Sequence, residues 1–302
     1  MSEKILILDS NSVLHRAFHA LPPLCTKEGF PTGAIYGFFL LLFKLLKEKN
    51  PQYFAFCFDF PAKTFRHQKF KNYKAQRPKT SQELVFQIQK TKEILDAFSF
   101  PIFEKEGFEA DDLIGTLVEK LPSNLEKIIV SGDSDVFQLI RKDVKVYFLG
   151  KNKTEVLFDE KKVKEKFFGI LPSQIPDFKA LVGDASDNIS GVSGVGEKTG
   201  AFLISKYKTA QNLLENIQKD PEIKDSTKKA ILKEKEKILE NLELLKIRKD
   251  LDLSFSLDQL KWQGYNKEKV IALFEKLEFK SLIKRLPEIE KFQKTPKPLS
   301  LL

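Results

Sequence analysis

Short apolar runs alternate with longer segments of helical periodicity along the first half of the chain. The predicted strands, rich in β-branched and aromatic residues, are 5–8, 53–58, 127–130 and 144–148. Two of the intervening segments, 34–49 and 83–98, carry apolar residues at helical spacing. Continuous apolar strands that alternate with helices are typical of a parallel sheet covered on both faces. The pattern therefore predicts an α/β fold with a parallel central sheet and helices on both faces over residues 1–170.

Beyond residue 170 the strand pattern stops and helical periodicity takes over. A glycine-rich stretch, GVSGVGEKTG at 191–200, interrupts the helical pattern, and no strand is predicted before it. Residues 226–249 mix Lys and Glu densely around spaced Ile and Leu, which predicts a solvated amphipathic helix. The expected division is an α/β domain over 1–170, a helical module over 171–290 and a tail over 291–302.

The composition is that of a globular protein with an excess of positive charge. The 302 residues are 42% hydrophobic and 31% charged, which argues against disorder. Lys and Arg outnumber Asp and Glu by 51 to 42, and this favours a polyanionic partner, nucleic acid first. Cys25 and Cys57 form no C-x-x-C pair, so neither a disulfide framework nor a zinc site is expected. The N-terminus does not resemble a signal peptide, and the most apolar run, 38–46, is too short to span a bilayer. We therefore expect a cytoplasmic protein without membrane association.

Acidic residues follow three of the predicted strands. Asp9 and Asp59 come directly after the first two runs, and Asp133 and Asp135 come shortly after the third. In an open parallel sheet, ligands bind in the crevice outside the carboxyl ends of the strands. We therefore expect these four side chains to converge on one edge of the sheet.

Two further acidic groups have ordinary explanations when each is taken alone. In GFEADDLIG (107–115), Glu109, Asp111 and Asp112 precede an apolar helical stripe, where carboxylates stabilise the helix dipole. In LVGDASDN, Asp184 and Asp187 lie three positions apart, a spacing that a simple turn also explains.

Taken together, these motifs supply nine carboxylates from five segments. Brought to one edge without counter-charge, they would repel one another by several kcal/mol, on the order expected for neighbouring charges. The set contains oxygen donors and neither His nor Cys, which favours hard divalent cations, Mg²⁺ or Mn²⁺, over zinc. Two such ions about 3.5–4 Å apart suit phosphodiester hydrolysis. The acidic motifs therefore predict a two-metal site.

Residues 61–82 form a basic segment directly after Asp59. They contain seven Lys or Arg and no Asp or Glu, with Phe65, Phe70 and Tyr73 between the cations. Cations bind backbone phosphates, and aromatic rings stack on unpaired bases. A solvated basic helix would have a similar composition, but the position beside the predicted metal edge favours nucleic-acid binding.

The glycine-rich stretch offers a second candidate contact with phosphate. Gly191, Gly194 and Gly196 allow a tight turn whose backbone N–H groups can meet a phosphate, assisted by Lys198. The spacing is not that of a Walker A loop, and most glycine-rich turns are only turns.

The order of these motifs is similar to that of a known family. ILILDSNSVLHRAFHAL, FDFPAKTFRHQKFKNYKAQRP, GFEADDLIG, VSGDSDVFQL and LVGDASDNISGVSGVGEKT together resemble the 5′→3′ exonuclease domain of bacterial DNA polymerase I, which belongs to the flap-endonuclease family. The resemblance covers about residues 3–287. It implies a PIN-like 5′-nuclease fold and a Mg²⁺-dependent 5′→3′ exonuclease or 5′-flap endonuclease. Such an enzyme removes flaps and RNA primers in DNA replication and repair by a two-metal-ion mechanism. No polymerase domain follows, and a freestanding member is favoured over an excised domain.

The resemblance also implies roles for individual residues. Lys74 and Arg77 match a basic pair that acts catalytically at the scissile phosphate, and Arg66 and Tyr73 would help to hold the 5′ end of the DNA. The metal ligands implied are Asp9, Asp59, Glu109, Asp111 and Asp112 for the first ion, and Asp133, Asp135, Asp184 and Asp187 for the second.

A helix–three-turn–helix at about 173–207 is implied as the duplex-binding part. Gly191, Gly194, Gly196 and Lys198 would grip the duplex there, beside a bound K⁺ ion. The other implied partner is a DNA polymerase acting in trans, and a monomer is expected. The terminal PLSLL (298–302) faintly resembles a sliding-clamp-binding peptide.

Two other functions stay open at this point. One is a non-catalytic protein that binds DNA structures without cutting them. The other is a ribonuclease of the related small nuclease fold, acting on structured RNA, against which the length and the glycine-rich turn argue. The sequence leaves open the balance of exonuclease to endonuclease activity, the choice between Mg²⁺ and Mn²⁺, and which carboxylates bind metal directly or through water.

Overall fold

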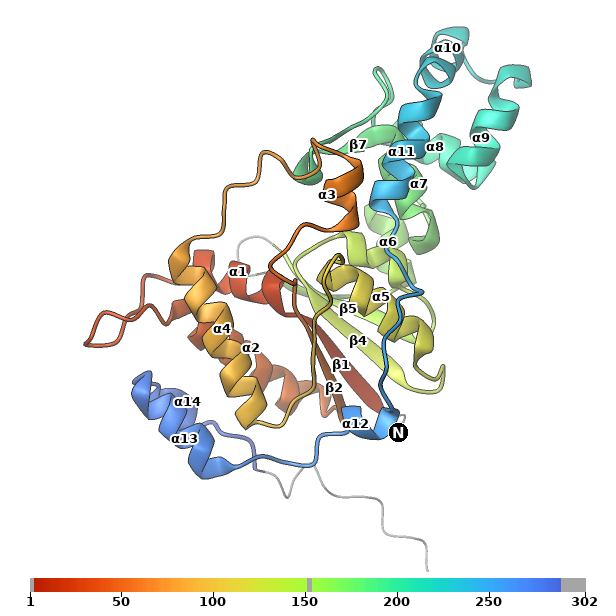
Figure 1. Ribbon diagram of the computed structural model, residues 1–302. Coiled ribbons are helices and arrows are strands. Elements are labelled where there is room, and N and C mark those ends of the chain that lie inside the picture. Colours follow the sequence, from red (N-terminus) through yellow and green to blue (C-terminus); the bar gives the residue numbers. More distant parts are fainter. Residues whose placement is uncertain (1–2, 151–153, 289–302) are drawn as a thin grey trace, which may run out of the picture.

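The computed structural model describes residues 3–150 and 154–288, and a six-stranded sheet forms its centre (Figure 1). The strands, in sheet order, are β3 (Ile102–Phe103), β2 (Tyr53–Cys57), β1 (Lys4–Asp9), β4 (Glu126–Ser131), β5 (Val144–Leu149) and β6 (Glu155–Phe158). All neighbouring pairs are parallel except β5 and β6. The predicted α/β fold with a parallel sheet is therefore confirmed. The apolar pattern missed β3 and β6, because one is two residues long and the other begins with the exposed Glu155.

Both faces of the sheet are covered, as its continuous apolar strands require. Ile5 and Ile7 of β1 enter one core cluster, whereas Leu6 and Leu8 enter the other, since successive side chains of a strand point to opposite faces. The first cluster includes α5 (Ala110–Lys120), and the second includes α1 (Ser10–Ala20), α2 (Gly33–Lys49) and α4 (Gln82–Ala97). Figure 1 shows α2 and α4 on one side of the sheet and α5 on the other.

The winding of the chain places the ends of β1 and β4 side by side. From β1 the chain winds outward through β2 to β3, and then returns to β4 on the opposite side of β1. Asp9 ends β1 and Ser131 ends β4, and the Ser131 hydroxyl donates a 2.6 Å hydrogen bond to Asp9 Oδ2. This reversal of strand order is where an open α/β sheet leaves a crevice for a ligand.

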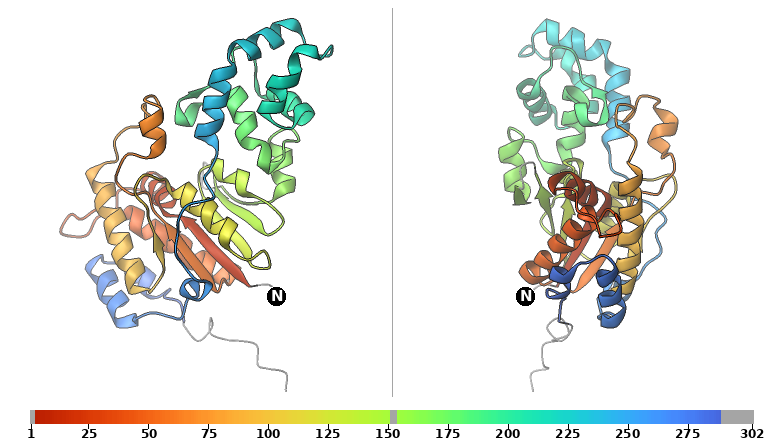
Figure 2. Two further views of the ribbon diagram at one scale, coloured as in Figure 1. Left: turned by 45° about the vertical axis from the view of Figure 1, so that its right-hand side comes forward. Right: turned by 90° about the vertical axis from the view of Figure 1, so that its left-hand side faces the viewer.

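A helical unit stands beyond this end of the sheet (Figures 1 and 2). Its helices are α6 (Glu160–Lys166), α7 (Ile175–Val182), α8 (Glu197–Tyr207), α9 (Ala210–Asn216), α10 (Asp225–Lys233) and α11 (Lys235–Leu245). Between α7 and α8, β7 (Gly183–Asp184) pairs antiparallel with β8 (Ile189–Ser190). A strand therefore does precede the glycine-rich turn, contrary to the expectation from sequence. The pair was missed because each strand is two residues long.

The helix expected over 226–249 is two helices. The N–H of Glu234 donates to the carbonyls of both Ala230 and Ile231, which ends α10 before α11 begins. The second helix is not solvated on every side. Its Ile238 and Leu242 are buried, and Asn241 donates a 3.1 Å hydrogen bond to the carbonyl of Ala180 in α7.

The chain then returns to the α/β core. Residues 246–288 include α12 (Leu257–Leu260), α13 (Lys267–Lys276) and α14 (Lys280–Ile283). Trp262 Nε1 donates to the carbonyl of Phe98, and Phe274 lies in the same core cluster as α2. The expected module of 171–290 therefore divides at about residue 245: the helices before it share a core cluster with one face of the sheet, and the chain after it packs on the α/β core. The predicted tail, 291–302, and its possible clamp-binding peptide lie outside the described residues. In the ranges that are described, no helix is both long and apolar enough to cross a membrane.

Candidate metal and nucleic-acid site

A cavity of about 620 Å³ opens at the C-terminal ends of the central strands. Its lining includes the carboxylates Asp9, Asp59, Glu109, Asp111 and Asp133 and the cations Lys74 and Arg77. A larger groove of about 1090 Å³ lies between α1, α2 and residues 284–288, but none of these seven side chains lines it. Five of the nine predicted carboxylates and both members of the basic pair therefore line the smaller cavity, whereas Asp112, Asp135, Asp184 and Asp187 do not.

Asp9 is held rigidly at the floor of this cavity. It is 5% exposed and caps α1, because Oδ1 accepts a 3.0 Å hydrogen bond from the backbone N–H of Ser12. Its other oxygen accepts from Ser131. Burial, together with repulsion from Asp59 and Asp133, raises the pKa of Asp9 to about 7 despite these hydrogen bonds.

Asp111 supplies a buried oxygen without a donor. Its Oδ1 has no hydrogen-bond partner in the described part of the chain. Burial, with repulsion from Asp9 and Asp133, raises the pKa of the Asp111 carboxyl well above its usual range. A buried polar atom without a partner is unfavourable, and a bound cation would satisfy it.

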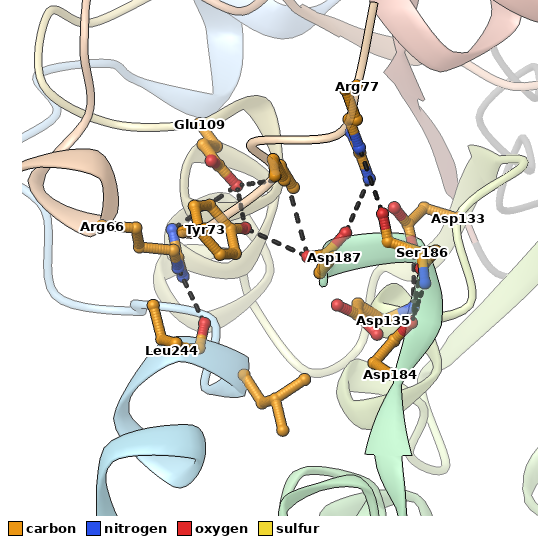
Figure 3. A network of polar contacts seen from close by, with 12 residues as sticks. Arg66, Tyr73, Arg77, Glu109, Asp133, Asp135, Asp184, Ser186, Asp187 and Leu244 are labelled. Atoms are coloured by element: carbon orange, nitrogen blue, oxygen red, sulfur yellow. Dashed lines mark hydrogen bonds and ion pairs between the residues drawn. The ribbon is translucent and has the colours of Figure 1, made fainter. Parts of the chain in front are cut away.

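The basic segment folds as α3 (Phe65–Lys69) followed by turns, and its Lys74 and Arg77 line the cavity. Figure 3 shows Tyr73 and Arg77 of this segment beside Asp187. Lys74 adopts a left-handed backbone conformation, with φ at 52°, and its Nζ lies 3.0 Å from Glu109 Oε2 and 3.7 Å from Asp187 Oδ2. Arg77 Nη2 lies 2.6 Å from the other oxygen of Asp187. Burial alone would raise the pKa of Glu109, but Lys74 and Arg66 outweigh it and hold the pKa below its ordinary value. The predicted basic pair therefore does lie among the predicted carboxylates.

A further cation, which the sequence reasoning missed, lies among the other acidic residues. The Lys179 ammonium of α7 contacts Asp135 Oδ1 and lies 2.6 Å from Asp184 Oδ2. Burial and the repulsion of Asp133 raise the pKa of Asp135 to about 7, even though Lys179 opposes the shift. A single Lys within the apolar helix IPDFKALV, five residues before Asp184, was the available signal.

Three predicted site residues have partners that the sequence did not indicate. Asp112 is fully buried and bonds to the Arg66 guanidinium through both oxygens, at 2.7 and 2.9 Å. The implied roles of Asp112 toward metal and of Arg66 toward DNA stay predictions, and the structure shows each side chain bonded to the other away from solvent. Tyr73 is 5% exposed, and its hydroxyl bonds to Glu109 and Asp187, so it positions carboxylates and does not present a free ring to DNA.

The carboxylates do not form a preassembled metal site. Within residues 3–150 and 154–288, no group of three or more His, Cys, Asp or Glu side chains could hold an ion as it stands. The protein's own cations, Lys74, Arg77 and Lys179, bond to Glu109, Asp135, Asp184 and Asp187 instead. The oxygen-only donor set, and the unpartnered oxygen of Asp111, nevertheless fit hard divalent ions.

The glycine-rich turn connects β8 with α8. A Cβ on Gly191 would lie 2.3 Å from the backbone carbon of Val182, so this glycine is required for packing. A Cβ added at Gly194, where φ is 79°, or at Gly196, which caps α8, would meet no atom within 4 Å. Lys198 is exposed on the first turn of α8. The two open glycines and Lys198 therefore form an accessible surface, whereas Gly191 is structural.

Two family models match the chain in consecutive order. The first, described as the N-terminal resolvase-like domain of 5′-3′ exonuclease, matches residues 4–168. The second, the C-terminal SAM fold of 5′-3′ exonuclease, matches residues 170–268.

Curated relatives agree with this assignment. The chain is 41% identical over 286 residues to a 5′-3′ exonuclease of Aquifex aeolicus, covering 94% of this chain and 96% of that protein. It is 42% identical over 287 residues to DNA polymerase I of Caldicellulosiruptor bescii, covering 94% of this chain. The chain spans about a third of the length of the DNA polymerase I relatives, 33% in that case.

Solved structures show the same fold at low sequence identity. The flap endonuclease of bacteriophage T5, in a pseudo-enzyme-product complex with DNA and metal ions, has a TM-score of 0.69 at 18% identity, covering 91% of this chain and all of that one (100%). The catalytic core of Rad2 with a DNA substrate has a TM-score of 0.61 at 15% identity, covering 94% and 93%. At these identities the likeness is one of fold. From the two consecutive family models and the full-length relative, we conclude that the chain belongs to the 5′-3′ exonuclease family.

Proposed function

We propose that this protein is a Mg²⁺-dependent, structure-specific 5′ nuclease that hydrolyses DNA at 5′ flaps, nicks and RNA primers. One observation carries the proposal: carboxylates and the basic pair Lys74 and Arg77, from distant segments, gather at one cavity at the switch point of the sheet. Family membership gives the reaction class, and relatives whose names include DNA polymerase I favour DNA over structured RNA. Roles in replication and repair follow from the same proposal.

The acidic residues would hold two divalent ions. The oxygen-only ligand set favours Mg²⁺, with Mn²⁺ as a substitute. When bound, such ions supply an activated water and stabilise the leaving oxygen. The residues that would hold them are Asp9, Asp59, Glu109 and Asp111 for the first ion, and Asp133, Asp135, Asp184 and Asp187 for the second. Asp112 is left out, because its two oxygens already bond to Arg66.

Lys74 and Arg77 would bind the scissile phosphate. Both cations line the cavity, and both bond to carboxylates that a metal ion would otherwise neutralise. On metal and DNA binding, these cations can exchange a carboxylate partner for a phosphate oxygen. Charge on the phosphate increases in the transition state, so fixed cations beside it lower the barrier. Arg66 and Tyr73 would act indirectly, by holding Asp112, Glu109 and Asp187 in place.

The helical unit would grip the duplex next to the cavity. Gly194, Gly196 and Lys198 offer an open backbone and a cation at the start of α8, where N–H groups favour phosphate. We place the implied K⁺ ion at this turn. The proposed helix–three-turn–helix over about 173–207 would be formed by α7, the short β7–β8 pair, the turn and α8. A monomer that works with a polymerase in trans is the simplest partner arrangement. A sliding clamp would bind the terminal peptide PLSLL (298–302).

A flap-cleavage assay tests the proposed activity. With Mg²⁺, a 5′-labelled flap oligonucleotide should release short labelled products, and EDTA should stop the release. Asp133→Ala should abolish cleavage yet leave flap binding nearly unchanged, because Asp133 lines the cavity and is not on the duplex-binding surface. Intact substrate with tight binding by the parent protein would instead establish a non-cleaving DNA-binding protein.

Matched DNA and RNA flaps separate the two nuclease classes. Preferential cleavage of the RNA flap would overturn the DNA assignment in favour of a ribonuclease. Product lengths from the DNA flap give the balance between exonuclease and endonuclease activity. A parallel titration with Mg²⁺ and Mn²⁺ identifies the ion that supports the higher rate.

A further inference from the structure

The side-chain ammonium of Lys179, in α7, contacts three oxygen atoms of neighbouring residues. Its ammonium contacts Asp135 Oδ1, lies 2.6 Å from Asp184 Oδ2 and donates a 3.1 Å hydrogen bond to Ser134 Oγ. These partners come from two separate segments, one after β4 and one after α7. Three oxygens around one cation give the ammonium its full number of acceptors.

The environment makes this contact strong and hard to replace with water. Lys179 and Asp135 are 8% and 9% exposed, and Asp133 and Asp187 add further negative potential around Asp135. Charges in such partly buried positions interact more strongly than on an open surface. Without Lys179, the Asp135 and Asp184 carboxylates would lose the cation that they share, and only Oδ1 of Asp184 would keep its hydrogen bonds from Ser186. The ammonium therefore stabilises the folded acidic edge when no metal is bound.

The same two carboxylates are proposed ligands of the second divalent ion. An ion held by Asp135 and Asp184 would use carboxylate oxygens that the ammonium now contacts. Like charges at that separation also repel. Lys179 and a divalent ion therefore cannot both occupy this position.

We propose that Lys179 is a built-in competitor for the second metal ion: its ammonium occupies the position between Asp135 and Asp184 in the metal-free protein and must leave before the ion enters. The proposal rests on the proposed function only in taking these carboxylates as metal ligands. Lys179 is thus a positioning residue. It keeps the two carboxylates together without metal and sets the ion concentration at which the second position fills.

Direct metal binding provides the main test. Calorimetric titration of Mn²⁺ into metal-free protein should resolve a tighter and a weaker ion. In Lys179→Met, affinity for the weaker ion should rise about tenfold or more, because a repelling and competing charge is removed. Lys179→Arg keeps the charge and should bind Mn²⁺ nearly as weakly as the parent. Unchanged or reduced affinity in Lys179→Met would overturn the proposal.

Thermal unfolding supplies the second readout, with Lys127→Met as a matched control. Lys127 is a fully buried lysine whose Nζ lies 2.5 Å from Asp143, and it lies toward the opposite end of β4 from the cavity. In EDTA, both variants should have a lower unfolding temperature than the parent protein. Added Mn²⁺ should raise the unfolding temperature of Lys179→Met more than that of the parent. The unfolding temperature of Lys127→Met should rise no more than that of the parent.

A third measurement follows the Lys179 ammonium itself by NMR in the unsubstituted protein, and a variant serves only to assign the signal. In the ¹⁵N-labelled parent, the protected Lys179 ammonium should give an NMR signal in EDTA, assigned by its absence from Lys179→Arg. Saturating Mg²⁺ should shift or remove this signal, and a signal that persists unchanged would contradict displacement. None of these readouts depends on cleavage. A parent that binds two ions but cuts no flap would sink the nuclease proposal and leave this one intact.

Discussion

Arg66 and Asp112 form a bidentate ion pair inside the protein, with N–O distances of 2.7 and 2.9 Å. Arg66 is 2% exposed and Asp112 is 0% exposed. The guanidinium also donates to the carbonyls of Leu244 and Lys246, and Asp112 accepts from the backbone N–H of Arg248. One pair thus joins α3 of the basic segment, α5 of the core and the chain after α11.

Removing one member of this pair should destabilise the whole protein. Asp112→Ala leaves the Arg66 guanidinium buried without its carboxylate, a loss that costs about 3–5 kcal/mol for buried pairs. We expect the free energy of unfolding, measured by urea denaturation of the metal-free protein, to fall by about that amount. The metal-free condition separates this structural role from any effect on ion binding.

The control is an exposed ion pair between Glu119, on the same helix α5, and Arg141, which lies shortly before β5. Glu119 and Arg141 are 51% and 39% exposed in their side chains, and such surface pairs are worth about 0–1 kcal/mol. Glu119→Ala should therefore change the free energy of unfolding by less than about 1 kcal/mol. Equal effects of Asp112→Ala and Glu119→Ala would refute the structural role of the buried pair.

Lys74→Ala should slow cleavage more than it weakens binding. Its ammonium lines the cavity and lies 3.0 Å from Glu109, so it is placed for the reacting phosphate and not for the flanking duplex. Removing one such fixed charge costs about 10²–10³ in the rate of the chemical step. Single-turnover cleavage and flap affinity, measured in the same buffer, separate the two effects. Arg77→Ala should behave similarly.

Lys71→Ala removes the same charge from the same basic segment. Lys71 is exposed and does not line the cavity. We expect a modest loss of affinity at low salt and a nearly unchanged single-turnover rate. A rate loss in Lys71→Ala as large as that of Lys74→Ala would show that net charge, and not position, governs catalysis.

The stability of the metal-free protein should fall as the pH rises from about 5 to 7.5. Burial raises the pKa of Asp9 and of Asp135 to about 7, from 3.8 in the unfolded chain. Between these values the folded state binds more protons than the unfolded state, so stability decreases with increasing pH. Each such proton contributes about 1.4 kcal/mol per pH unit. The lowered pKa values of Glu109 and Asp184 act only below this interval. The lowered pKa values of His15 and His67 oppose the trend within it, and the raised pKa values of Asp59, Asp111 and Asp187 reinforce it.

Unfolding temperatures in a chelator at several pH values provide the measurement. Asp9→Asn should flatten the decline, because the neutral amide has no proton to lose. Saturating Mg²⁺ should raise the unfolding temperature more at pH 7.5 than at pH 5.5, since metal ligands must be deprotonated. A metal-free protein whose stability increases over this interval would contradict the raised pKa values.

Alanine substitution at two glycines of the turn before α8 should affect the stability of the fold differently. Gly196 has φ at −84° and no atom within 4 Å of a new Cβ, so Gly196→Ala should leave the unfolding temperature unchanged. Any loss of duplex affinity in that variant would report DNA contact directly. A Cβ at Gly191 would lie 2.3 Å from the backbone of Val182, so Gly191→Ala should destabilise the fold by about 1–3 kcal/mol. Equal melting temperatures for the two variants would contradict this packing.

Much of the fold follows from local pattern. Continuous apolar runs predicted the four longest strands, and acidic residues after three of them predicted where a ligand edge would form. This succeeds because a strand buried on both faces must be apolar along its whole length. The short strands β3, β7 and β8 escaped, since two residues carry no periodicity. The sequence pattern also did not predict the break between α10 and α11, because both helices keep a helical spacing of apolar residues.

The sequence alone determined which segments carry acidic and basic side chains and, through the strand ends, where most of them meet. Only the tertiary structure decided which carboxylate bonds to which cation. Asp112 and Arg66 are 46 residues apart in sequence, and Asp135 and Lys179 are 44 apart. Composition treats Asp111 and Asp112 alike, yet one leaves an oxygen unpartnered in the cavity and the other is neutralised in the core. The physical reason is that helix α5 points adjacent side chains in different directions, and burial then makes the choice of partner decisive.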